Sequence, residues 1–137
     1  WRSQRLARQP VSLIAAPHLS PPPAFPKGLN GHAFILPGVE NATRHAFDQL
    51  CSHYRLTPKI AAEVDDMAMM RLLARDTQHI AVMPPVVVRD ELHNGTLKDY
   101  GALPGVWEEF YAITIQRRFE SPSLKALLTR SGESLLD

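Results

Sequence analysis

Short apolar runs recur along the chain and predict buried strands. They lie at residues 11–16, 33–36, 59–64 and 79–83, and proline, glycine or polar residues bound each of them. Runs this short favour strands over helices. Residues 107–116 predict a further strand, covered on both faces because apolar side chains occupy odd and even positions alike.

Between these runs, apolar side chains recur at helical spacing. Residues 42–55 predict a helix with Asn41 as its N-terminal cap, and Arg44 and Asp48 lie off its apolar face. That face is formed by Ala42, Ala46, Phe47, Leu50, Cys51 and Tyr54.

Three more helical segments are expected. Asp65 should cap a second helix that ends near Arg75, and residues 86–94 predict a short helix or turn that stops at Asn94-Gly95. The last helix is expected at residues 122–130. Residues 97–104, between the segment at 86–94 and the strand at 107–116, are expected to form a connector.

Strands that alternate with helices predict the α/β class, with a mostly parallel sheet and helices on both faces. In such sheets, ligands bind at the carboxyl ends of the strands, close to helix N-termini. The pattern therefore selects three loops, at residues 37–43, 65–67 and 83–86, as the candidate binding region.

Size and charge restrict the possible functions. The chain has 137 residues, enough for one domain, and a formal net charge of +1. This balance gives no reason to expect nucleic-acid or membrane binding by these residues.

Arg2, Arg5 and Arg8 could form a phosphate-binding arm, but a solvated leading segment is the preferred interpretation. One cysteine, no membrane-length apolar run and no signal-peptide pattern predict a cytoplasmic protein, and the start without Met suggests a fragment.

The motifs of common enzyme and metal sites do not occur. There is no glycine-rich phosphate loop, and the six histidines include no pair at ligand spacing, so neither a cofactor nor a metal is expected. Cys51 could act as a hydrolase nucleophile with His45 or His53 as its base. Its place on an apolar helix face favours a buried, inert thiol instead.

Four carboxylates lie near the predicted strand ends. Glu63, Asp65 and Asp66 follow the third strand, and Glu40 lies in a neighbouring loop. Carboxylate oxygens are ligands that a hard cation prefers, so a cation site is one interpretation. Helix capping and surface exposure are the simpler alternative, and they are preferred.

The order of these elements resembles the effector-binding domain of LysR-type transcription regulators, a type-2 periplasmic-binding-protein-like fold. Within that family the chain is similar to the NhaR-like regulators of sodium/proton antiporter genes. The stretches that carry the resemblance are Phe34-Ile35-Leu36-Pro37-Gly38, Glu63-Val64-Asp65-Asp66-Met67-Ala68-Met69-Met70 and Trp107-Glu108-Glu109-Phe110-Tyr111-Ala112-Ile113.

The resemblance implies a ligand sensor, not an enzyme. Residues 11–102 would form the second lobe, residues 106–137 would return to the first lobe, and the DNA-binding winged helix-turn-helix would be absent. The effector would be a small molecule or a monovalent cation, with sodium inferred for an NhaR-like activator, and the protein would form homo-oligomers. The implied effector-binding residues are Pro37, Gly38, Glu40, Asn41, Thr43, Asp65, Asp66, Met83 and Pro84. A solute-binding receptor and a Cys51 hydrolase are the alternatives.

Overall fold

A computed structural model describes the backbone of residues 2–114 and the side chains of residues 7–110. Within this part of the chain, five strands form one sheet in the order β3-β2-β4-β1-β5. The strands are β1 (Arg2–Ala15), β2 (Ala33–Leu36), β3 (Lys59–Glu63), β4 (Ile80–Met83) and β5 (Lys98–Thr114).

The sheet contains both strand orientations. β2 pairs in parallel with β3 and with β4, whereas β1 runs antiparallel to β4, with Ser12 opposite Met83. The predicted α/β class is therefore confirmed. The alternation of strands and helices did not reveal the direction of β1, because no helix connects β1 to β2.

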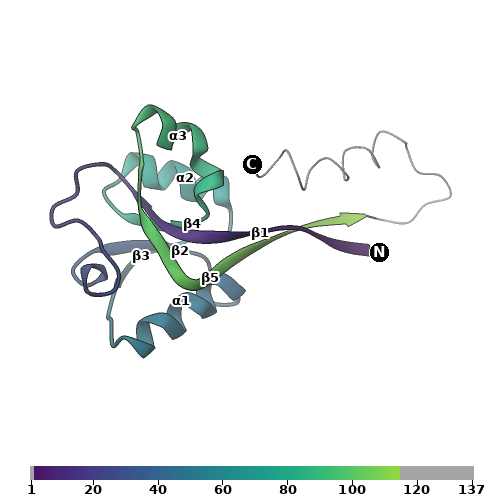
Figure 1. Cartoon of the computed structure of the whole chain (residues 1–137), viewed down its shortest axis with the longest axis horizontal. Coiled ribbons are helices and arrows are strands. Elements are labelled where there is room, and N and C mark those ends of the chain that lie inside the picture. The colour runs from purple at the N-terminus through teal and green to yellow at the C-terminus, as the bar shows by residue number, and fades with distance from the viewer. Residues whose placement is uncertain (1, 115–137) are drawn as a thin grey trace. The chain divides into compact units, whose positions relative to one another are not determined.

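Helices cover both faces of the sheet (Figure 1), as the pattern predicted. α1 (Ala42–His53) packs on one face, and α2 (Met67–Asp76) and α3 (Arg89–Asn94) lie on the other. Side chains alternate along β2, so Phe34 and Leu36 join the core beneath α1, while Ile35 joins the core beneath α2.

Polar caps fix where the helices begin. Asn41 caps α1 as predicted, since its side chain accepts from the amides of Thr43 and Arg44. The prediction that Asp65 caps α2 is wrong. The cap is Asp66, which accepts from the Ala68 amide, and Asp65 instead accepts from the Gly38 amide.

The third helical segment has the predicted form. A 3₁₀ turn (Pro85–Val88) leads into α3, which ends at Gly95 in the left-handed region, at φ 81°. Another 3₁₀ turn, Lys27–Leu29, lies in the proline-rich loop between β1 and β2. Within the described part of the chain, no helix has both the length and the apolar character needed to cross a membrane.

Two strands are longer than the sequence predicted. The leading residues were expected to be a solvated segment, but β1 begins at Arg2. The connector expected at residues 97–104 belongs to β5, which starts at Lys98. Its Gly101, Pro104 and Gly105 suggested a loop, yet β5 is the outermost strand, where proline and glycine are tolerated.

The chain divides into two compact units. Pro10–Trp107 form one, and Trp1–Gln9 together with Glu108–Asp137 form the other. The helix expected at residues 122–130 lies outside the described residues. The two-lobe boundaries inferred from the resemblance stay a prediction.

Candidate ligand-binding wall

Three loops selected from the sequence leave the same edge of the sheet. β3, β2 and β4 are neighbours and run parallel, so the residues that follow Glu63, Leu36 and Met83 share their carboxyl-end edge. We call the residues 37–43, 65–67 and 83–86 at this edge the wall. Their common location is what a binding crevice requires.

The first wall loop is held in one conformation by hydrogen bonds to its carbonyl groups. The Arg44 guanidinium donates to the carbonyl of Pro37 at 3.0 Å, and the amide of Asn41 donates to the carbonyl of Gly38 at 3.0 Å. The ring of His45 contacts the carbonyl of Val39 through Nε2. With these three carbonyls occupied, the loop is preorganised before any ligand arrives.

A direct bond joins two of the wall loops. The amide of Gly38 donates to Asp65 Oδ1 over 2.9 Å. A Cβ at position 38 would lie 2.9 Å from the same oxygen, so a larger residue would push the Asp65 side chain away. Glycine thus permits the close approach that couples the exit of β2 to the exit of β3.

The predicted site residues differ in what they can offer a ligand. Asn41 is occupied as a helix cap, and the hydroxyl of buried Thr43 donates to the carbonyl of Trp107 at 3.1 Å. Met83 and Pro84 are buried and act as support beneath the surface. The exposed members of the predicted set are Glu40, Asp65 and Asp66.

Arg44, in α1 next to the first wall loop, is a structural residue that the sequence analysis did not select. It is 5% exposed although it lies off the apolar face. Its Nε donates to both carboxylate oxygens of Asp48, and its Nη1 donates to Glu63 at 2.6 Å. Burial works against the charged guanidinium, but the hydrogen bonds to Glu63 and Asp48 prevail and raise the Arg44 pKa. The i, i+4 spacing of Arg44 and Asp48 was the available signal.

The four carboxylates do not gather around one point. Glu63 pairs with Arg44, Asp65 accepts from Gly38, and Asp66 caps α2. Among the described residues, no three or more histidine, cysteine, aspartate or glutamate side chains are placed to hold a metal ion. The cation site considered from the sequence is not formed by these side chains.

Cys51 lies in the core beneath α1, as its helix position predicted. Burial, with a contribution from Asp48, raises the pKa of its thiol to about 11. The reactive thiolate is therefore scarce at neutral pH.

We expect Cys51 to react with iodoacetamide at pH 8 about two orders of magnitude more slowly than an unperturbed thiol, from the difference between the two thiolate fractions. Mass spectrometry of timed samples measures the rate, and the urea-unfolded chain provides the reference. Equal rates in the folded and unfolded chain would contradict the burial of Cys51.

Comparison with known proteins identifies relatives over most of the chain. The model of the LysR substrate binding domain family matches residues 1–135. The chain is 26% identical over 118 residues to the transcriptional activator protein NhaR of Escherichia coli. This alignment covers 85% of the chain and 39% of that relative, so the chain spans less than half the length of the curated protein.

Solved structures share the fold. The effector domain of the transcriptional regulator AmpR of Pseudomonas aeruginosa matches with a TM-score of 0.73 at 15% identity, over 98% of this chain and 66% of that chain. The regulatory domain of Synechocystis CcmR, solved in complex with 2-PG, matches with a TM-score of 0.65 at 16% identity, over 98% and 68% of the two chains. Vibrio fischeri DarR, solved with DNA, gives 0.68 at 15% identity, over 99% and 46%.

Proposed function

Because the chain belongs to the LysR substrate binding domain family, we propose that it is the ligand-sensing part of a LysR-type transcription regulator. The family is one of binding domains, in agreement with the expectation that the chain is not an enzyme. The observation that carries the proposal is the wall: three loops at one sheet edge, one of them fixed by hydrogen bonds and joined to the next through Gly38 and Asp65.

In this proposal the wall is one side of the effector crevice. Residues 11–102 are the second lobe, and residues 106–137 return to the first lobe. The division of the chain near Pro10 and Trp107 supports this assignment. An effector that contacts Glu40, Asp65 or the backbone of the first wall loop would favour one arrangement of the lobes. DNA would be bound by a winged helix-turn-helix outside the present sequence.

The finer proposal is that the regulator is an activator that responds to sodium and controls a sodium/proton antiporter gene. Its support is the similarity to NhaR. Because no three of these carboxylates lie together, a sodium site here would need backbone carbonyl or water oxygens as well. Homo-oligomerisation also stays a prediction.

Sodium binding can be tested directly by thermal unfolding of this chain in sodium chloride and in potassium chloride at equal ionic strength. At ten times its Kd, sodium would stabilise the chain by about 1.4 kcal/mol. This corresponds to a rise in Tm of roughly 3–5 °C.

Coincident unfolding curves in the two salts would contradict the sodium response of this chain. They would leave the sensor proposal in place, because the wall does not depend on the identity of the effector. The broader proposal is tested by screening small organic effectors for localised amide shifts at residues 38–43 and 65–67. If no effector that regulates the intact protein perturbs these loops, the wall is not its binding site.

A further inference from the structure

A pocket lies away from the wall. It has a volume of about 490 Å³ and opens between the turn after β1, the end of α3 and the start of β5. The lining residues are Pro17, His18, Leu92, Gly95, Leu97, Lys98 and Asp99. β1 is antiparallel to β4, so the turn after Ala15 lies near the beginning of β4, whereas the wall lies at its end.

Tyr100 fixes the turn that forms one side of this pocket. Its hydroxyl donates to the carbonyl of Ala16 at 2.6 Å and accepts from the amide of Leu19 at 3.2 Å. Between these two anchors, His18 has a φ of 65°, in the left-handed region that non-glycine residues rarely adopt. The structure maintains an unfavourable backbone conformation at the pocket, and such conformations often accompany binding sites.

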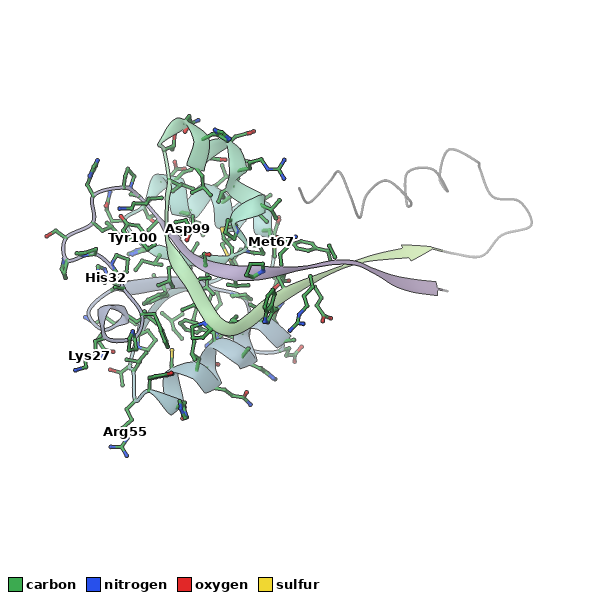
Figure 2. The ribbon with its side chains drawn as sticks, viewed as in Figure 1. Lys27, His32, Arg55, Met67, Asp99 and Tyr100 are labelled. Atoms are coloured by element: carbon green, nitrogen blue, oxygen red, sulfur yellow. The ribbon has the colours of Figure 1, made fainter. Side chains whose placement is uncertain are left out.

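The lining combines apolar surface with both signs of charge. Pro17, Leu92 and Leu97 are apolar, and the consecutive residues Lys98 and Asp99 at the start of β5 carry opposite charges. The ammonium group of Lys98 lies 5.1 Å from the centre of the Tyr100 ring, within cation–π distance. Figure 2 labels Tyr100 and Asp99 to the left of Met67, which lies at the start of α2.

We propose that this pocket binds a free amino acid with an apolar side chain. The apolar lining would contact the side chain, Lys98 would attract the carboxylate, and Asp99 would attract the ammonium. A simple organic anion would be repelled by Asp99, and a simple amine by Lys98. The pocket volume falls in the usual range for small-molecule sites, about 300–1,000 Å³. This site is independent of the wall and of the proposed sensing of sodium.

Three phenyl compounds separate these possibilities. L-phenylalanine carries both charges, 3-phenylpropanoate lacks the ammonium, and phenethylamine lacks the carboxylate. We expect L-phenylalanine to cause saturable shifts in the amide NMR signals of His18 and residues 92–99 of the full chain. Each singly charged compound should bind about threefold to fivefold more weakly, the effect of one partly exposed ion pair. Shifts at residues 37–43 and 65–67 should be absent.

Two conservative variants assign the charges. Lys98→Gln should weaken the binding of L-phenylalanine about threefold to fivefold without weakening the binding of phenethylamine. Asp99→Asn keeps an oxygen that can accept from the Gly101 amide, as Asp99 does at 2.8 Å, and should weaken L-phenylalanine without weakening 3-phenylpropanoate. Lys59→Gln, on exposed β3, is the matched control and should leave the affinity for all three compounds unchanged.

The proposal is overturned if no saturable shift occurs, if the shifts fall outside the pocket, or if the three compounds bind equally. Equal binding would identify a purely apolar surface depression. Effects of Lys59→Gln as large as those of Lys98→Gln would show only a response to net charge.

Discussion

Phe47→Ala is expected to lower the free energy of unfolding by about 3–5 kcal/mol, the usual cost of removing a buried phenylalanine ring. Phe47 is 1% exposed and packs its ring against Phe34, with the ring centres 5.7 Å apart. The substitution leaves a cavity between α1 and β2, and α1 carries Arg44 and His45, which hold the first wall loop. Urea unfolding followed by circular dichroism measures the loss.

Leu72→Ala is the matched control, because Leu72 also lies on a helix but is 41% exposed. Its effect should be below about 1 kcal/mol, since an exposed side chain loses little on truncation. If the two substitutions cost the same, Phe47 does not pack in the core as described.

Arg44→Ala is expected to cost about 2–3 kcal/mol, from the loss of charge-assisted hydrogen bonds and of the donor to the buried carbonyl of Pro37. The figure lies well below a sum over all the bonds, because Glu63 and Asp48 are 48% and 51% exposed and can be solvated by water. The carbonyl of buried Pro37 loses its guanidinium donor. Urea unfolding gives the total cost, and hydrogen exchange at Gly38 and Asn41 reports on the loop.

Arg44→Lys distinguishes charge from geometry. Lysine keeps the positive charge but not the planar fork that reaches Asp48, Glu63 and Pro37 together. We therefore expect it to recover only part of the stability and of the hydrogen-exchange protection. Full recovery by lysine would show that charge alone matters. Faster exchange without any loss of stability would show that Arg44 fixes the first wall loop without stabilising the domain.

Much of the fold could be predicted from the spacing of apolar residues. The helix over α1, the strands β2 and β4, and the turn at Gly95 all follow from local patterns and caps. The lengths of β1 and β5 could not, because strand pairing is a long-range interaction that allowed arginines, proline and glycine to enter the sheet. The direction of β1 depends on the same long-range pairing.

The sequence predicted that the three wall loops lie at one edge of the sheet, but it did not predict the contacts that they make. Parallel strands necessarily bring their carboxyl ends to one edge, so the grouping of the three loops required only the strand order. The exchange of roles between Asp65 and Asp66 depends on which carboxylate reaches Gly38, and a sequence does not show that. The burial of Arg44 likewise depends on Glu63, which is remote in sequence.

The alternation along β2 has a consequence for how the domain can vary. Phe34 and Ile35 are consecutive, yet they belong to cores on opposite sides of the sheet. Mutations at these neighbours should therefore couple less strongly than mutations at Phe34 and Phe47, whose rings pack together. During evolution, the core beneath α1, which supports Arg44 and the first wall loop, can thus change its side chains while the core beneath α2 stays the same.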